Sequence, residues 1–170
     1  MYGIISKDLK APYYENIRFS YILPEKIPNT RAFSPERSIA IIFEDLCMAS
    51  ESIQNQIIPF FTHGRHRNIS SIYVTQRYHH TPIIIRENIS HLVVFNGGSF
   101  YQDISKVIGR YTEDVKNTSM VVNSYFRKGE FIVFDLNKSD DDPLAIQLRF
   151  DTPLDLQKEV KLREKRNKGS

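Results

Sequence analysis

The 170-residue sequence contains no tryptophan and a single cysteine, Cys47. One cysteine excludes an internal disulfide framework and is typical of proteins from a reducing compartment. The longest apolar runs are about five residues, far below the roughly 20 that span a bilayer. The first ten residues contain no apolar core of the length that a signal peptide needs. We therefore expect a soluble, intracellular protein with no membrane partner, in either the cytoplasm or the nucleus.

Excess positive charge is confined to the end of the sequence. The chain has 23 Lys and Arg against 20 Asp and Glu, a formal net charge of +3. Residues 157–170 hold six of the basic residues and two of the acidic ones, which leaves 17 basic and 18 acidic residues in 1–156. This basic tail is either a solvated chain end or a contact for DNA phosphates, and composition leaves both hypotheses open.

The sequence divides into three parts. Four prolines interrupt residues 1–37, which we expect to be irregular. Across residues 38–150, short apolar runs alternate with helix-like segments, and this alternation predicts an α/β layer fold. Residues 151–170 form the basic tail, for which Thr152-Pro153 predicts a helix start and the remaining residues a frayed helix or disorder.

Three apolar runs each lead into a polar residue, and such runs are typical of strands buried on both faces of a parallel sheet. The runs and their polar ends are 39–43 with Glu44 and Asp45, 71–75 with Gln76, and 92–95 with Asn96. Ligands bind beyond the carboxyl ends of parallel strands. We therefore expect these polar groups to converge on one rim.

The segments between and after these runs predict helices and a hairpin. After Ser50, a suitable helix cap, four apolar residues share one helical face: Ile53, Ile57, Phe60 and Phe61. Pro59 should end or kink that helix. Helical periodicity returns after residue 100 and again after 112. Residues 131–136 and 145–150 bracket a polar turn and predict an antiparallel hairpin.

The acids after the first run suit nucleoside triphosphate hydrolysis. One carboxylate can hold Mg²⁺ while the other orients or deprotonates the attacking water. Gln76 could hydrogen-bond the γ-phosphate and that water. Strand-end acids also serve solubility and helix capping, so each signal alone is weak. Arg65 and Arg67, in the basic segment 62–68, suit an arginine finger, a nucleic-acid contact or a solvated turn.

The spacing of these segments is more specific than any one of them. The sequences SIAIIFEDL, FFTHGRHRNISSIYVTQRY and IIIRENISHLVVF resemble the core of the FtsK/HerA branch of P-loop ATPases. Within that branch they are similar to the poxvirus-type virion DNA-packaging ATPases of large DNA viruses and virus-like transposons. The resemblance covers about residues 36–111, with weaker similarity to the hairpin near residue 150.

The resemblance assigns roles at the rim. Glu44 matches the metal-associated acid, Asp45 the water-activating acid of the Walker B motif, and Gln76 the sensor glutamine. It implies Mg-ATP as the cofactor. The chain departs from the family in having Glu-Asp where Asp-Asp or Asp-Glu is usual, so the two acid roles could overlap.

The resemblance also implies partners. Arg65 matches the arginine finger that reaches a neighbouring subunit's nucleotide, with Arg67 as the alternative. Arg86 and Asn88 match an Arg-x-Asn element with a structural or inter-subunit role. The family acts on DNA, and its complete members are expected to form homo-oligomeric rings.

The family's phosphate loop, GxxxxGK[ST], has no counterpart here, because no glycine of the chain is followed by lysine. That loop cradles phosphate with its amides and neutralises it with its lysine. The chain thus resembles a carboxyl-terminal half: an incomplete P-loop NTPase-like fold with a mostly parallel sheet, helices on its faces and a C-terminal hairpin. We expect no ATP hydrolysis by the chain alone and doubt that it binds the nucleotide alone. The alternatives are a non-enzymatic DNA-binding or oligomerisation module and a degenerate remnant.

His63 and His66 have a spacing that a metal could use. Cys47 is the only cysteine that could join them. We expect no metal other than Mg²⁺.

Overall fold

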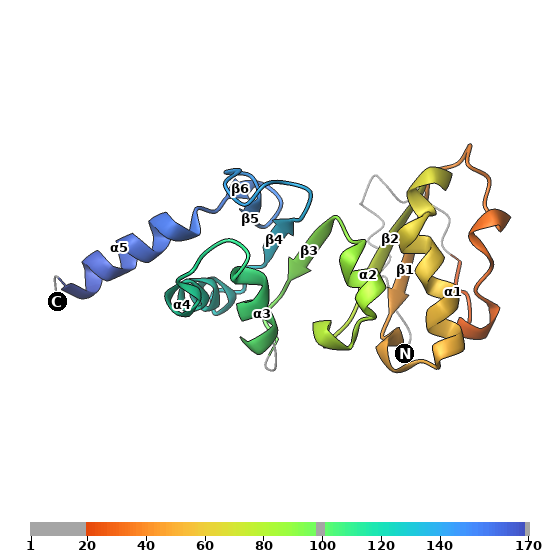
Figure 1. The fold of residues 1–170 in the computed structure, drawn as a ribbon, viewed down its shortest axis with the longest axis horizontal. Helices are drawn as coiled ribbons and strands as arrows, with labels where there is room; N and C mark the ends of the chain where they lie inside the picture. Colours follow the sequence, from red (N-terminus) through yellow and green to blue (C-terminus); the bar gives the residue numbers. More distant parts are fainter. Residues whose placement is uncertain (1–19, 98–100, 169–170) are drawn as a thin grey trace, which may run out of the picture.

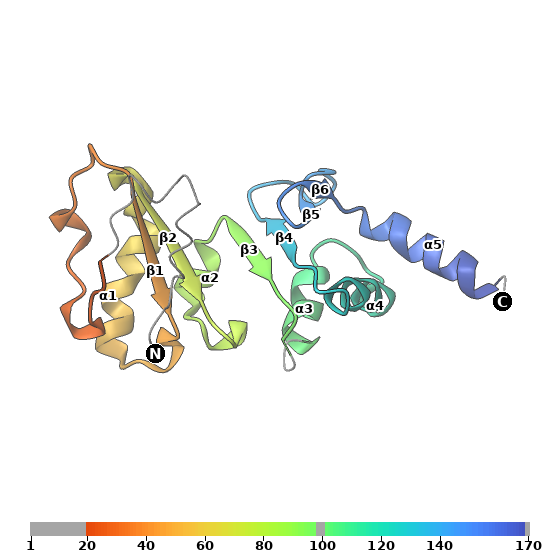
Figure 2. The same ribbon diagram turned by 180° about the vertical axis from the view of Figure 1, so that it is seen from behind.

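The computed structural model describes residues 20–97 and 101–168, which form two groups of elements (Figure 1). The first group contains a two-stranded sheet and the second a four-stranded sheet, and each group has its own hydrophobic core. The two groups lie side by side in both views, with β3 (His91–Val94) at the boundary between them (Figures 1 and 2).

The first group is built on a parallel pair of strands. β1 (Ile39–Glu44) and β2 (Ile69–Val74) run in register from Ile39 opposite Ile69 to Glu44 opposite Val74. Between them the chain forms η3 (Leu46–Met48), α1 (Glu51–Thr62) and η4 (Gly64–Arg67). Two further short helices, η1 (Pro24–Lys26) and η2 (Thr30–Ala32), precede β1. The core of this group consists of Phe43, Ile57, Phe60, Ile69 and Ile85.

Only one face of the parallel pair is well covered. Successive side chains of a strand point to opposite faces, and the burial of β1 and β2 alternates accordingly. Phe43 and Ile69 are buried with the residues of α1. On the opposite face, Ile42, Ile72 and Val74 are 60%, 48% and 43% exposed. We call these three residues the open face; parallel sheets are usually covered on both sides.

Pro59 was expected to end or kink the helix, and it does not end α1. The helix continues to Thr62, and the N–H of His63 still donates to the carbonyl of Pro59 at 3.0 Å. A proline removes the hydrogen bond to the carbonyl four residues earlier, here that of Asn55, which is an exposed residue. Burial of Ile57 and Phe60 holds the turn around it.

The second group is antiparallel throughout. Its strands are β3 (His91–Val94), β4 (Ile132–Asp135), β5 (Ile146–Leu148) and β6 (Thr152–Pro153), in that order across the sheet. Its helices are α3 (Tyr101–Ile108), α4 (Val115–Phe126) and α5 (Leu156–Lys168). No helix in the described part of the chain is long and apolar enough to cross a membrane.

The predicted α/β content and the β4–β5 hairpin are confirmed, whereas the mostly parallel sheet is not. β3 pairs antiparallel with β4 instead of extending the β1–β2 pair. Asn96, expected at the shared rim, therefore follows a strand of the other sheet. An apolar run of four residues does not specify its pairing partner. Thr152-Pro153, expected to begin a helix, forms β6, and α5 begins at Leu156.

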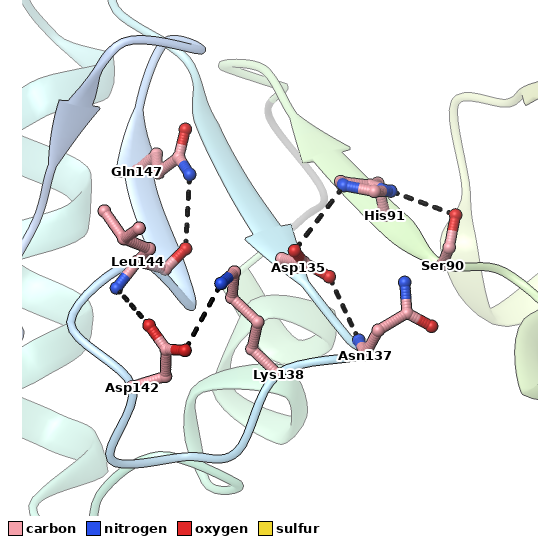
Figure 3. Close-up of polar contacts among 8 residues, drawn as sticks. All are labelled: Ser90, His91, Asp135, Asn137, Lys138, Asp142, Leu144 and Gln147. Atoms are coloured by element: carbon pink, nitrogen blue, oxygen red, sulfur yellow. Dashed lines mark hydrogen bonds and ion pairs between the residues drawn. The ribbon is translucent and has the colours of Figure 1, made fainter.

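The polar turn between β4 and β5 is held by Asp142 (Figure 3). Its Oδ1 accepts from the N–H of Leu144 at 2.7 Å, and its Oδ2 accepts from Nζ of Lys138 at 3.2 Å. The hydrogen bond from Leu144, and then the lysine, lower the pKa of Asp142. Nearby, Asp135 accepts from the N–H of Asn137 at 3.1 Å. These contacts assign the acidic residues to turn formation.

Candidate functional site

The two candidate acids lie at the carboxyl edge of the parallel pair. Glu44 is the last residue of β1 and stands opposite Val74 of β2. The N–H of Asp45 donates to the carbonyl of Val74 at 3.0 Å, so the hydrogen bonding continues one residue beyond β1. Asp45 then takes a left-handed backbone conformation with φ of 53°. This conformation ends the strand and starts the turn into η3.

Gln76 follows the neighbouring strand at the same edge. It lies two residues beyond Val74, in a turn closed by the N–H of Arg77 donating to Oγ1 of Thr75 at 3.2 Å. Its side chain is exposed. The fold therefore brings the strand ends that carry Glu44, Asp45 and Gln76 together, and leaves Asn96 apart. Their roles in catalysis remain predictions.

The environment of the acids fits a hard cation. Glu44 and Asp45 are both exposed. Among residues 20–97 and 101–168, the side chain of neither acid has a hydrogen bond or an ion pair. Carboxylate oxygens are the ligands that Mg²⁺ uses in proteins, usually one or two of them together with substrate phosphates. The donor set therefore suits a Mg-nucleotide, although the chain lacks the glycine-rich loop that would hold the phosphates.

Arg65 and Arg67 lie at the opposite edge of the parallel pair. They belong to η4, which directly precedes β2. The next residue, Asn68, marks the start of the pair, because its carbonyl accepts a hydrogen bond from the N–H of Ile39 at 3.0 Å. β1 has six residues, and at roughly 3.3 Å per residue the two edges are about 20 Å apart. This separation exceeds the length of an arginine side chain. The arginines cannot reach the acids of their own copy.

Two arginines that sequence reasoning missed lie near η4. η2 packs against η4, and Nδ2 of Asn68 donates to the carbonyl of Pro35 at 3.4 Å, which brings the 34–37 turn close. Arg31 and Arg37 on these segments are exposed. Among the described residues neither has an ion-pair partner. No local signal marks them, because their approach to η4 depends on tertiary packing.

Arg86 and Asn88 hold the backbone around α2 (Ile83–Glu87). Nε of Arg86 donates to the carbonyl of Thr81 at 3.0 Å, and its guanidinium lies 5.6 Å from the ring centroid of Tyr78. Nδ2 of Asn88 donates to the carbonyl of Ile84 at 2.8 Å. Tyr78 also packs against the core of the second group. The Arg-x-Asn segment thus supports the connection between the two groups.

The histidines do not assemble a metal site in the part of the chain that the structure covers. His63 Nδ1 lies 2.7 Å from Oγ1 of Thr62. Among the described residues, no group of three or more His, Cys, Asp or Glu side chains could hold a metal ion.

Comparison with known proteins identifies a family. The family model described as Poxvirus A32 protein matches residues 13–130, more than half of the chain. The DNA packaging protein OPG160 of variola virus is 48% identical over 42 residues, which are 25% of this chain and 16% of that protein. The protein of the same name from vaccinia virus (strain Copenhagen) matches equally, and that of monkeypox virus matches over 14% of its length. The matched stretch is a small part of these relatives. No solved structure matches the chain.

Proposed function

The chain belongs to the poxvirus A32 protein family, and from that premise we propose that it is the acid-bearing part of a DNA-packaging ATPase. The observation that carries this proposal is the edge of the parallel pair, where Glu44, Asp45 and Gln76 end neighbouring strands. The name of the relatives, DNA packaging protein, supports DNA as the partner.

The proposed roles follow from the chemistry of the three side chains. Glu44 binds the metal, Asp45 accepts the proton of the attacking water, and Gln76 orients that water through its amide. Bound Mg²⁺ would supply neutralisation of phosphate charge. The left-handed backbone at Asp45 supports a role for that residue, because strained conformations cluster at functional sites.

The position of the arginines supports an assembly. About 20 Å separates them from the acids of the same copy, so an arginine finger at Arg65 or Arg67 acts only on the nucleotide of a neighbour. A ring of FtsK/HerA type provides such a neighbour. In such a ring, the edge where the strands of one parallel pair begin, with Arg65 and Arg67, faces the edge where the strands of the next pair end, with Glu44 and Asp45.

We do not expect the 170-residue chain to hydrolyse ATP alone. No glycine of the chain precedes lysine, so the amides and the ammonium group that hold a triphosphate are missing. We expect weak metal binding at the acids and no turnover of Mg-ATP. ATP hydrolysis that depends on Glu44 in the purified chain would contradict this expectation.

A manganese titration tests the acid site directly. Mn²⁺ is a paramagnetic substitute for Mg²⁺, and water proton relaxation reports its binding in the presence of ATP. Glu44→Gln should weaken binding about tenfold, because it removes an anionic ligand. Asp45→Asn should weaken binding less, because Asp45 is proposed as the base and contributes only a nearby negative charge. Asn also tolerates the left-handed backbone at position 45.

The matched control is Glu36→Gln. Glu36 is an exposed acid in the turn before β1, at the opposite edge of the pair. Its loss should leave Mn²⁺ affinity unchanged. Equal affinities for the Glu44, Asp45 and Glu36 variants would overturn the metal role of the strand-end acids.

A non-enzymatic oligomerisation module is the second candidate, and the open face favours it. Ile42, Ile72 and Val74 present apolar surface that association with another chain would cover. Sedimentation equilibrium separates the two candidates when it is combined with the titration. A stable oligomer without metal binding would support the module, whereas metal binding at Glu44 would support the ATPase part.

A further inference from the structure

The inward face of α5 anchors this helix to the second group. Leu156 and Val160 are buried in the core of that group, and α5 packs along α4. The carboxylate of Glu159 in α5 acts on the hydroxyl of Tyr125 in α4. Burial first, and then the carboxylate of Glu159, raise the pKa of the Tyr125 hydroxyl. The orientation of α5 about its own axis is therefore fixed by contacts on this side.

The outward face of α5 carries lysines. Lys158, Lys161 and Lys165 are exposed, and their spacing of three and four residues places them on one helical face. Arg163 belongs to the other side, where its Nη2 lies 3.9 Å from Sδ of Met120. We call the three exposed lysines the lysine face. In Figures 1 and 2, α5 extends from the four-stranded sheet to one end of the molecule.

The dimensions of the lysine face match a polyanion with closely spaced charges. Lys158 and Lys165 are separated by about 10 Å along the helix axis, at 1.5 Å per residue. Each strand of duplex DNA has one phosphate per roughly 3.4 Å of helix axis, so this length covers about three phosphates. Lysine is a strongly hydrated point charge on a flexible stem, which suits contacts that do not depend on sequence.

A membrane surface fits α5 less well. A helix that lies in a bilayer interface needs a wide apolar face beside its charged one. The apolar residues Leu156 and Val160 are already buried against the protein. Leu162 is the one large hydrophobic residue of the described part of α5 that is exposed, at 38%. Charge without an available apolar face favours a nucleic-acid backbone.

We propose that the lysine face of α5 binds the phosphate backbone of DNA without sequence preference. This inference rests on the proposed function for the identity of the polymer, and it adds the surface that contacts it. It is independent of the acids at the edge of β1–β2, which belong to the other group of elements. A DNA-binding measurement and a metal titration can therefore fail separately.

The test measures binding of the 170-residue chain to a fluorescent DNA duplex of random sequence at increasing NaCl concentration. The variant Lys158→Gln, Lys161→Gln, Lys165→Gln removes three charges and keeps residues that favour helix. Each lost phosphate contact reduces the slope of log affinity against log salt by about 0.9. We expect the slope to fall by two to three, about 0.9 per lysine, and the affinity at low salt to fall at least tenfold.

The control variant is Lys26→Gln, Lys106→Gln, Lys116→Gln, which makes the same change in net charge at three other exposed lysines. Its salt slope should change by less than one, and far-UV circular dichroism should show equal helix content in both variants. If the two variants have equal slopes of log affinity against log salt, the lysine face is not the DNA-binding surface and the inference is overturned. DNA would then remain the partner, bound through another surface. Failure of the wild-type chain to bind the duplex, or binding only to anionic lipid vesicles, would overturn both the lysine face and the DNA partner.

Discussion

The two sheets of this molecule differ in how completely they are buried. In the antiparallel sheet, Ile132 and Phe134 of the central strand β4 are 0% exposed. In the parallel pair, Ile42 at the middle of β1 is 60% exposed. The candidate site nevertheless lies on the parallel pair. The second group therefore has the larger buried core, while the candidate acids of the first group lie on a sheet that is exposed on one face.

The largest expected effect comes from the better buried sheet. Phe134 packs with its ring centroid 5.6 Å from that of Tyr111 and has no exposed surface. Phe134→Ala should lower the free energy of unfolding by about 3–5 kcal/mol, because it removes a large buried side chain and leaves a cavity. Urea denaturation followed by far-UV circular dichroism measures the change.

Phe60→Ala is the matched variant in the first group. Phe60 is 2% exposed and contacts the rings of Phe33 and Phe43. Hydrogen exchange read by peptide should show faster exchange in β1 and β2 for Phe60→Ala, and faster exchange in β4 for Phe134→Ala. If both variants accelerate exchange in both sheets equally, the two cores unfold as one unit and the comparison fails.

Polar substitution of the open face should have a smaller effect on folding and a clear effect on association. Ile42→Thr, Ile72→Thr and Val74→Thr keep a β-branched side chain. A hydroxyl replaces the ethyl arm of each isoleucine and one methyl group of the valine. Each should change the free energy of unfolding by about 0.5 kcal/mol or less, while light scattering shows less self-association. Ile69→Thr, at a buried position of the same pair, is the destabilising control.

The smallest effect concerns pH and the β4–β5 turn. The pKa of Asp142 is lowered in the folded chain, first by the hydrogen bond from Leu144. A lowered pKa means that the carboxylate stabilises the fold above the unfolded value, and that this contribution is lost as pH falls through the folded value. The urea midpoints of the wild type and Asp142→Asn should differ near neutral pH, and the difference should shrink as the pH falls below the ordinary carboxyl value of 3.8. A difference that is constant across this range would contradict the assignment.

The sequence predicted the elements whose signal is local. The apolar run before Glu44 is β1, the periodic residues around Ile57 form the inward face of α1, and the runs on both sides of the polar turn pair as β4 and β5. The approach of Glu44 and Gln76 also follows from sequence, because parallel neighbours end at one edge. Each of these inferences needs only short segments and a general packing rule.

The remaining features depend on pairing between distant segments. β3 has four residues, and its apolar side chains would suit either sheet. Pro59 is tolerated because the lost hydrogen bond concerns an exposed residue, which its neighbours in sequence do not reveal. Arg31 approaches η4 through the contact of η2 with η4, and Arg37 through the hydrogen bond from Asn68 to the carbonyl of Pro35. The separation of Arg65 from the acids follows from the register of the parallel pair, which the sequence does not reveal.

The backbone at Asp45 restricts which substitutions this turn accommodates without strain. A φ of 53° is accessible to glycine, asparagine and aspartate, and costs more for glutamate and other residues with longer side chains. Exchanging the two acids would put glutamate into that conformation. A family member that kept this turn with the order Asp-Glu would carry that cost, which the order Glu-Asp of this chain avoids, so geometry as well as chemistry favours the order found here.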